Sequence, residues 1–326
     1  MLGPRHAKTG STPLVIDKTV KLEINRSTQQ IRMCAERTGL PPILIVQAGP
    51  GLPVLHEVAK FQRRLHLESE FLVSYWDQRG CGNASRQDAK SVSLQQQVTD
   101  LCTVLQWLQN ETKQKIIVFG ISLGATIVLQ AVAHEPDKAK SVIAISPDAN
   151  TASSDAAVFS FLQEQRGLAT GQRFITKLKK LGEPPYTDPA AFQLRGRLLA
   201  DLGGIEHHKK FSAILRETLF GMIRAYGLLG TAKALRNMNL IQSALLPQLV
   251  SLNLFANPPR LAMPVHYVFG EQDPLTPPAI AKQLPLAIAA PEITTVLVPD
   301  AGHMVHFDQP DVVRSIAVKA WNDAQD

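Results

Sequence analysis

The feature that most constrains the fold of this chain is a series of short apolar runs separated by helical patterns. Each run is bounded by polar, Gly or Pro residues, which is typical of strands buried on both faces of a sheet. The runs cover residues 42–46, 71–76, 116–119, 142–145, 265–269 and 295–298. Strands that alternate with helices predict βαβ units, and therefore an α/β protein with a mostly parallel sheet and helices on both faces.

The segments between these runs show the spacing of amphipathic helices. Leu94, Val98, Leu101, Leu105 and Leu108 recur every three or four residues, which predicts one apolar helix face. Residues 125–133 and 312–321 predict two further helices. Before the first buried run, residues 14–24 alternate loosely, and residues 30–36 could form the partner strand of a hairpin.

The alternation stops between about residues 149 and 262, where no convincing strand is present. This interval predicts helices, for example over 211–229 and 231–254, with Gly or Pro pairs at 184–185, 203–204 and 258–259. Helical sequence inserted into a sheet indicates a cap. We therefore expect a core in two parts, 1–148 and 263–326, with a helical cap over 149–262.

A G-x-S-x-G sequence, Gly120 to Gly124, lies between a predicted strand and a predicted helix. This strand–turn–helix setting is that of a nucleophile elbow, in which a sharp turn exposes the serine hydroxyl above the sheet. Ser122 is therefore the candidate nucleophile. The backbone N–H of Leu123, at the helix N-terminus, is a candidate oxyanion donor. The alternative is an ordinary tight turn between a strand and a helix.

A serine nucleophile needs a base, and His303 is the best candidate. It follows Gly302 in the loop after the last predicted strand, where an open α/β sheet places its reactive groups. His306, one helical turn later, is the competitor, and we expect it to be a supporting or surface histidine. His207 and His208 belong to the cap and have the pattern of a solvated pair.

The base needs an acid to orient it, and Asp273 follows the strand that ends at Phe269. Glu271 in the same turn and Asp148 after an earlier strand are the alternatives. The chain order Ser122, Asp273, His303 is the order expected of this fold. A second oxyanion donor is expected in the Gly/Pro-rich loop after the first buried strand, where we assign the N–H of Gly49.

Composition excludes several other classes. The chain has three cysteines, few and widely spaced, which argues against a disulfide framework and favours a reducing compartment. We therefore expect a cytoplasmic protein, and the start of the chain lacks the apolar region of a signal peptide. No Cys/His cluster has metal-ligand spacing, so we expect neither a metal nor an organic cofactor.

The net charge of +6 does not predict a nucleic-acid partner, because no Lys/Arg tract is longer than two residues and no nucleic-acid motif is present. No apolar stretch approaches the roughly 18–20 residues of a membrane span. The expected partner is a small molecule or a short peptide. The sequence does not indicate an oligomeric state.

Taken together, these residues resemble the α/β-hydrolase superfamily and, within it, the proline iminopeptidase (prolyl aminopeptidase) branch. That branch has His-Gly-Gly-Pro-Gly after the first buried strand, and residues 47–51, Gln-Ala-Gly-Pro-Gly, keep the last three. Its Asp-Gln-Arg-Gly loop, followed by Gly and Ser, matches residues 77–80 with Gly82 and Ser85. The Gly-Glu-x-Asp-x-x-x-Pro and Gly-His patterns match residues 270–277 and 302–303.

The resemblance covers roughly residues 15–148 and 262–326 and implies the α/β-hydrolase fold. It also suggests that Asp77 and Arg79 brace the loops through a local ion pair. Two motifs depart from the branch: the elbow is Gly-Ile-Ser-Leu-Gly instead of Gly-Gly-Ser-Trp-Gly, and Gln47 stands where the branch has histidine.

Substrate class is the open question. An aminopeptidase must pair the free amine of its substrate with carboxylates, and Glu206 and Glu217 are candidates in the cap. The cap has 14 Lys/Arg and 7 Asp/Glu, which mildly favours a neutral or anionic acyl substrate unless these charges face solvent. We therefore expect a serine hydrolase, either aminopeptidase-like or a carboxylesterase or lactonase. A non-catalytic ligand sensor is the remote alternative.

Overall fold

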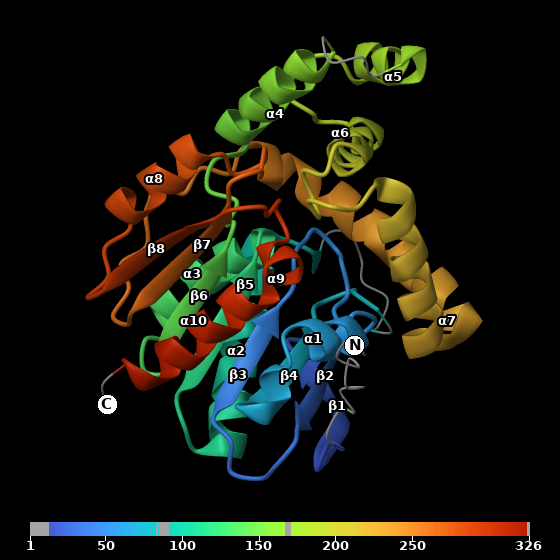
Figure 1. The fold of residues 1–326 in the computed structure, drawn as a ribbon. Coiled ribbons are helices and arrows are strands. Elements are labelled where there is room, and N and C mark those ends of the chain that lie inside the picture. Colours follow the sequence, from blue (N-terminus) through green and yellow to red (C-terminus); the bar gives the residue numbers. More distant parts are fainter. Residues whose placement is uncertain (1–12, 83, 85–90, 167–170, 325–326) are drawn as a thin grey trace, which may run out of the picture.

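The computed structural model of the chain describes residues 13–82, 84, 91–166 and 171–324. In these residues eight strands form one sheet, in the order β1-β2-β4-β3-β5-β6-β7-β8 (Figure 1). The strands are β1 (Ile16–Ile24), β2 (Ser27–Ala35), β3 (Pro42–Val46), β4 (Leu72–Asp77), β5 (Ile116–Ile121), β6 (Ala139–Ile145), β7 (Val265–Gly270) and β8 (Ile293–Val298).

The sheet is parallel from β4 to β8 and antiparallel at its N-terminal edge, where β1 pairs with β2 and β2 with β4. The β1–β2 hairpin turns at Asn25 and Arg26, which both have positive φ, as a two-residue turn between antiparallel strands requires. The predicted α/β fold with a mostly parallel sheet is confirmed, and so is the predicted hairpin.

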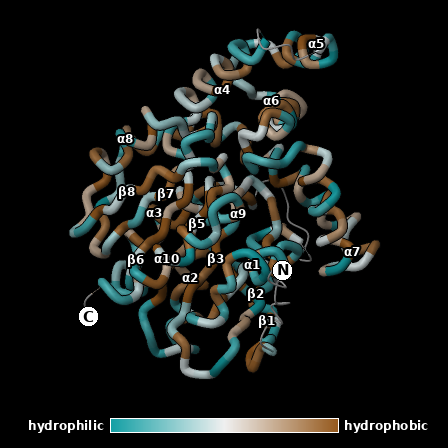
Figure 2. The backbone as a smooth tube through the Cα atoms, in the orientation of Figure 1, coloured by the Kyte–Doolittle hydropathy of each residue, from teal (hydrophilic) through white to brown (hydrophobic). Residues whose placement is uncertain are grey.

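Helices cover both faces of the sheet. α2 (Leu94–Thr112), α3 (Leu123–His134) and α8 (Pro278–Ala287) pack into one apolar cluster. On the opposite face lie α1 (Val58–Arg64), α9 (Val305–Asp308) and α10 (Pro310–Asn322). A short 3-10 helix, Leu67–Ser69, precedes β4. Figure 2 shows the hydrophobic backbone segments gathered at the centre of this three-layer arrangement.

The position of each strand in the sheet explains its sequence pattern. β3 and β5 are buried along their whole length, because neighbouring strands and both helical layers enclose them. β8 lies at the edge, so only Val298 of this strand is buried, and two of its six residues are Thr. The apolar runs of β3 and β5 are thus central strands, whereas the run at 295–298, which the sequence predicted to be buried on both faces, belongs to an edge strand.

The interval between β6 and β7 is helical in the described residues, apart from isolated bridges at Asn150 and Arg260. It contains α4 (Thr151–Gln165), α5 (Gln172–Leu181), α6 (Pro189–Asp201) and α7 (Phe211–Val250). α7 is interrupted at Gly227, which has φ 69° and ψ 177°. The sequence predicted two helices divided at Gly230, so the number of helices is right and the position of the break is three residues too late.

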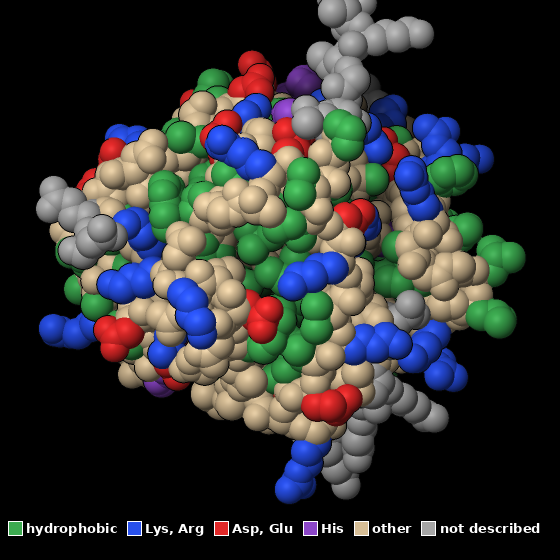
Figure 3. All heavy atoms as spheres, turned by 90° about the horizontal axis from the view of Figure 1, so that it is seen from below, with side chains coloured by type: hydrophobic (Ala, Val, Ile, Leu, Met, Phe, Trp, Pro, Cys, Tyr) green, Lys and Arg blue, Asp and Glu red, His purple; other side chains and the backbone are tan. Residues whose placement is uncertain are grey.

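The two halves of α7 have different surroundings. Ile241, Leu245 and Leu249 of the second half belong to the apolar cluster beneath the sheet's α2–α3 face. The first half lies against the segment before α1, where Met222 is buried and Gly221 contacts His56, and on its outer side Phe220 is 73% exposed. In Figure 3, hydrophobic side chains stand out at the edge on the α7 side, among Lys and Arg side chains. α4, α5 and α6 share a separate small core.

The expected ion pair between Asp77 and Arg79 is wrong. Arg79 pairs with Asp100 of α2, at 2.7 Å from Nε to Oδ2, and also donates to the carbonyl oxygens of Ile24 and Asn25. Asp77 accepts bonds from three groups of the loops and the cap: the amides of residues 54 and 55, and the hydroxyl of Tyr226. Both side chains do brace loops, through different partners.

Ser85, the last residue matched to this loop motif, lies outside the described residues.

Candidate active site

Ser122 lies at the tip of a sharp turn between β5 and α3. Its backbone has φ 53° and ψ −125°, a conformation that costs energy for a residue with a side chain and is typical of a nucleophile elbow. Its amide donates to the carbonyl of Ile145 on β6, which fixes the turn above the sheet. The hydroxyl therefore stands at the carboxyl ends of the parallel strands, where the sequence placed it.

The two glycines of the elbow are required by close packing. A Cβ atom on Gly120 would lie 2.4 Å from the Cα of Ala125, and one on Gly124 would lie 2.4 Å from the carbonyl oxygens of Val46 and Gln47. No side chain fits at either position without moving backbone. The pair of glycines thus lets α3 begin directly against the loop that follows β3.

Three side chains that are distant in sequence form one chain of hydrogen bonds. His303 Nδ1 lies 2.8 Å from Asp273 Oδ2, and His303 Nε2 lies 2.8 Å from Ser122 Oγ. Because a carboxylate only accepts, Nδ1 carries the proton and Nε2 of the neutral ring accepts from the serine hydroxyl. Ser122 is 6% exposed, and His303 and Asp273 are each 2% exposed.

Asp273 is held by its own turn. Its Oδ1 accepts the amides of Leu275 and Thr276 at 2.8 and 3.1 Å, which leaves Oδ2 for His303. Gln272 joins this turn to the histidine loop, because its amide donates to the carbonyl of Ala301 and its side chain accepts the Ala301 amide. The acid and the base are therefore fixed as one unit at the ends of β7 and β8.

The cap also anchors the histidine loop. The amide of His303 donates to the carbonyl of Gly204 at 3.0 Å, and the amide of Met304 donates to Ile205 at 2.8 Å. Asp308 accepts the amides of both Gly302 and His207 at 2.9 Å. This use of the Gly203-Gly204 segment was not foreseen from the sequence, where the pair indicates only a break between helices.

The surroundings of His303 set its proton affinity. Burial disfavours the imidazolium, but the charge and hydrogen bond of Asp273, together with the charge of Asp148, outweigh it. The pKa of His303 is therefore raised above its ordinary value of 6.5. A raised pKa makes the imidazole a stronger proton acceptor than a free histidine.

The competing candidates lie elsewhere. His306 is fully buried and not at the surface, and its ring stacks on Phe61 at 5.3 Å. Neither of its ring nitrogens has a hydrogen-bond partner in the described residues, and burial lowers its pKa well below the usual range. Glu271 is exposed, and His207 and His208 contact each other at the edge of the cap.

Asp148, weighed above as an alternative acid, lies beside the serine instead of the histidine. Its Oδ1 is 3.5 Å from Ser122 Oγ, long for a hydrogen bond. Burial raises the pKa of this carboxyl, against the lowering effect of His303 and Arg195. Arg195 of α6 is itself buried and forms an ion pair with Asp155 of α4. Nothing in the sequence pattern indicated that Arg195 of the cap would act electrostatically on Asp148 and His303.

The two predicted oxyanion donors are neighbours. A Cβ atom on Gly49 would lie 2.9 Å from Cδ2 of Leu123, so the loop after β3 passes directly over the start of α3. Leu123 is the first residue of α3, so its N–H has no acceptor within the helix. Gln47, which stands in place of the branch histidine, accepts the Ala48 amide and bonds to Glu57.

The basic charge of the cap faces solvent. Of its 14 Lys and Arg side chains, 11 are exposed and only Arg195 is buried. The two candidate acids are already neutralised: Glu206 pairs with Lys60 and Lys209 at 2.6 and 3.0 Å, and Glu217 pairs with Lys209 at 2.6 Å. The net charge of the cap therefore says little about the charge of the substrate.

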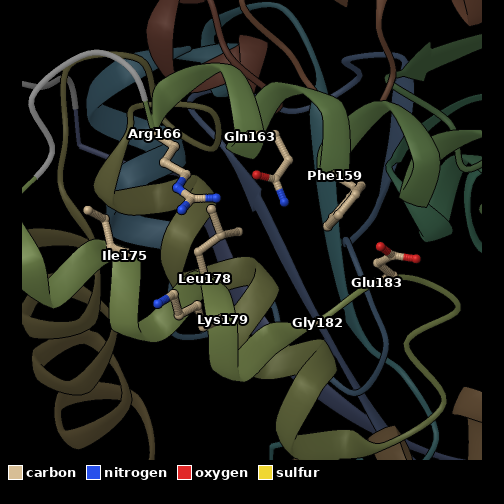
Figure 4. A pocket seen from close by; sticks show the side chains of 8 residues that line it. All are labelled: Phe159, Gln163, Arg166, Ile175, Leu178, Lys179, Gly182 and Glu183. Carbon is tan, nitrogen blue, oxygen red and sulfur yellow. The ribbon is translucent and has the colours of Figure 1, made fainter.

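The linings of three surface hollows do not include Ser122, and one hollow of about 420 Å³ lies between the start of α5 and the end of α6. A second, of about 180 Å³, lies between α4 and α5, and Figure 4 shows Arg166, Gln163 and Leu178 among its lining. Another, of about 300 Å³, lies between α1 and the first half of α7 and includes His56 and Phe220. In the part of the chain described, no helix is long and apolar enough to span a membrane.

Burial also accounts for the cysteines. Cys81, next to the Asp77–Gly80 loop, is fully enclosed, and desolvation raises the pKa of its thiol well above the usual range. Desolvation likewise raises the pKa of Cys34 to about 12 and that of Cys102 to about 11. These thiols stay protonated at neutral pH and do not compete with Ser122 as nucleophiles.

Comparison with known proteins gives the same fold. A protein of Bacillus subtilis (strain 168) named "Probable aminopeptidase YbaC" is 26% identical over 300 residues, 90% of this chain and 92% of that protein. The structure of a proline iminopeptidase-related protein of Thermus thermophilus matches with a TM-score of 0.61 at 18% identity, covering 94% of this chain and 98% of that chain. The proline iminopeptidase of Mycobacterium smegmatis gives a TM-score of 0.62 at 16% identity, with coverage of 94% and 98%.

The resemblance inferred from the motifs is thereby confirmed. The family model for the alpha/beta hydrolase fold matches residues 41–310, which include the elbow, the acid turn and the histidine loop. The chain belongs to the α/β-hydrolase family.

Proposed function

We propose that this hydrolase is a serine hydrolase that cleaves an amide or ester bond through an acyl-enzyme, with aminopeptidase-like activity as its main reaction. The observation that carries the proposal is the buried chain of hydrogen bonds from Asp273 through His303 to Ser122. It lies at the carboxyl ends of the strands, and we assign the oxyanion to the amides of Leu123, the first residue of α3, and of Gly49, which packs against it.

In the proposed mechanism, Ser122 Oγ attacks the substrate carbonyl carbon while its proton moves to Nε2 of His303. Asp273 stabilises the imidazolium, and the amides of Leu123 and Gly49 bind the oxyanion. Each such donor is worth roughly 3–4 kcal/mol in the transition state. His303 then protonates the leaving amine or alcohol as its bond to carbon breaks. A water molecule, deprotonated by His303, then attacks the carbonyl carbon of the acyl-enzyme. The bond between that carbon and Ser122 Oγ breaks, His303 returns the proton to the serine, and the acid is released.

The aminopeptidase assignment draws on the likeness to an aminopeptidase and to proline iminopeptidases. Carboxylesterase or lactonase activity on small hydrophobic acyl compounds is the second candidate. It is favoured by the departures from the branch pattern at Ile121, Leu123 and Gln47. We place the enzyme in the cytoplasm, in keeping with three free cysteines.

The two candidates are separated by a paired assay with proline β-naphthylamide and p-nitrophenyl butyrate. The aminopeptidase assignment predicts turnover of the prolyl amide, and loss of that turnover when its amine is acetylated. An enzyme that cleaves the butyrate ester but leaves every free-amine prolyl substrate untouched would contradict the peptidase assignment and retain the serine mechanism.

A further inference from the structure

A carboxylate that the mechanism does not use lies next to the nucleophile. Asp148 follows β6, and its Oδ1 is 3.5 Å from Ser122 Oγ. The hydroxyl of Thr126, on α3, donates to the Asp148 backbone carbonyl at 2.8 Å, which fixes this residue against the elbow helix. Asp148 does not orient the base, because His303 Nδ1 is bonded to Asp273.

This position is unfavourable for the reaction unless a positive charge joins it. The transition state develops negative charge on the substrate oxygen, and an unpaired carboxylate beside the serine repels that charge. Among the described residues, no Lys, Arg or His side chain forms an ion pair with Asp148. The cation whose field reaches it, Arg195, is bound to Asp155.

The charges around Ser122 leave a negative balance. Asp155 is bound to Arg195 and Asp273 to His303, whereas Asp148 has no ion-pair partner among the described residues. When His303 is neutral, no cation of these residues contacts either Asp148 or Asp273, and the positive field on Asp148 is that of Arg195. The site therefore attracts a cation, although the outer surface of the cap is basic.

We infer that Asp148 pairs with the α-ammonium group of the substrate's first residue, which makes it the residue that selects free N-termini. This inference rests on the proposed serine mechanism and extends it to a substrate class: peptides or amides from which a single N-terminal residue is removed.

The bond lengths of an amino acid fit this pairing. The ammonium nitrogen lies two bonds from the scissile carbonyl carbon, a distance of roughly 2.5 Å. In a reactive complex that carbon lies roughly 3–3.5 Å from the serine oxygen. The ammonium is therefore within a few ångströms of Ser122 Oγ, as Asp148 Oδ1 is. One more residue would move the amine away by roughly 3.3–3.6 Å, so a dipeptide-releasing enzyme would need its carboxylate farther out.

The other acids of the cap do not fill this role. Glu206 and Glu217 pair with Lys60 and Lys209. Asp155 pairs with Arg195. Asp148 thus combines closeness to the serine with a carboxyl group that no cation of the described residues pairs with.

The kinetic test compares two acyl groups of the same shape, prolyl and cyclopentanecarbonyl, each presented as its p-nitrophenyl ester. They differ in the ring amine. For Asp148→Asn, the ratio of kcat/KM for the prolyl ester to that for the neutral ester should fall at least roughly 30-fold. Glu217→Gln, which removes an exposed cap carboxylate, should leave the ratio within about threefold of wild type.

A binding test works without turnover. In a Ser122→Ala background, calorimetry with L-prolinamide should show binding that is weakened at least roughly 30-fold by adding Asp148→Asn. Cyclopentanecarboxamide, which lacks the amine, should bind both proteins with equal affinity. This measurement reports on the subsite even if Ser122 proves not to be the nucleophile.

Two results would overturn the inference while leaving the serine mechanism intact. One is an equal loss of activity on both esters in Asp148→Asn, which would mean that this carboxylate acts on the hydrogen-bonded chain itself. The other is equal binding of L-prolinamide to both Ser122→Ala proteins. A selective fall in the prolyl ratio together with weaker L-prolinamide binding supports it.

Discussion

The imidazole of His303 lies 2.8 Å from the hydroxyl of Ser122, a residue 181 positions earlier in the chain. The sheet order explains the contact: β5, β6 and β7 are adjacent, and the loops at their carboxyl ends converge. Asp273, at the end of β7, accepts a hydrogen bond from the same ring, with 2.8 Å between its Oδ2 and His303 Nδ1. Each prediction below tests a part of the structure on which this convergence or its chemistry depends.

Neutralising the acid should disable the base. In Asp273→Asn the side chain no longer fixes the Nδ1–H tautomer of His303, and kcat should fall by roughly 10,000-fold. Steady-state kinetics with a nitrophenyl ester measure the loss. Glu271→Gln, in the same turn but exposed, is the matched control and should stay close to wild type. A larger loss of kcat in Glu271→Gln than in Asp273→Asn would show that Glu271, and not Asp273, orients the histidine.

The pH profile should report the raised pKa of His303. The ring must be neutral to accept the serine proton, so kcat/KM falls as the pH drops through that pKa, with a midpoint above 6.5. A neutral ester keeps substrate titration out of the profile. Because the charge of Asp148 contributes to the rise, Asp148→Asn should move the midpoint to lower pH. A midpoint at or below 6.5 in the wild type would contradict the description of the site.

The buried Arg79–Asp100 pair should be a main determinant of stability. Asp100 accepts from Arg79, Gln29, Asn25 and Gln96, so Asp100→Asn removes a buried negative charge that is bonded to the guanidinium of Arg79. The free energy of unfolding in urea should fall by about 3–5 kcal/mol. Asp137→Asn, an exposed change, should shift it by less than about 0.5 kcal/mol. Similar effects of the two substitutions would show that this pair does not brace the fold.

His306 should make the fold sensitive to acid. Its pKa in the folded state is well below the ordinary value of 6.5, so below that pH the unfolded chain binds a proton that the folded chain does not. The free energy of unfolding should therefore decrease as the pH falls below 6.5, by up to about 1.4 kcal/mol per pH unit from this residue.

His306→Phe, which retains a ring against Phe61, should flatten this dependence, and exposed His208→Gln should not. The check is urea unfolding at several pH values between about 5 and 7, the range in which a histidine of the unfolded chain titrates. An unchanged slope in His306→Phe would mean that other groups cause the acid sensitivity.

The sequence predicted most of the core because the central strands have no polar face. β3 and β5 are buried at every position, so their apolar runs have one structural explanation. The break in α7 was placed at Gly230 instead of Gly227, because the sequence offers two glycines three residues apart and either could interrupt the helix. The partner of Arg79 was assigned to a near neighbour, whereas the fold supplies Asp100 from 21 residues away.

The candidate site was predictable to the extent that strand ends determine it. Ser122, Asp273 and His303 each follow a strand that the sequence predicted, and they occur in the chain order expected of this fold. Asp148 also follows a strand, and sequence alone does not show whether its carboxylate turns to the histidine or to the serine. That choice depends on loop conformation, and so does the contact of His303 with Gly204 of the cap.

The most direct test of the central claim is covalent labelling of Ser122. A fluorophosphonate probe reacts with a serine whose proton is accepted by a neighbouring base, so mass spectrometry of the wild-type protein should place the adduct on Ser122. Ser122→Ala should remain folded by circular dichroism, take up no label and hydrolyse neither proline β-naphthylamide nor p-nitrophenyl butyrate. Full activity in Ser122→Ala, or an adduct on a different residue, would contradict the account.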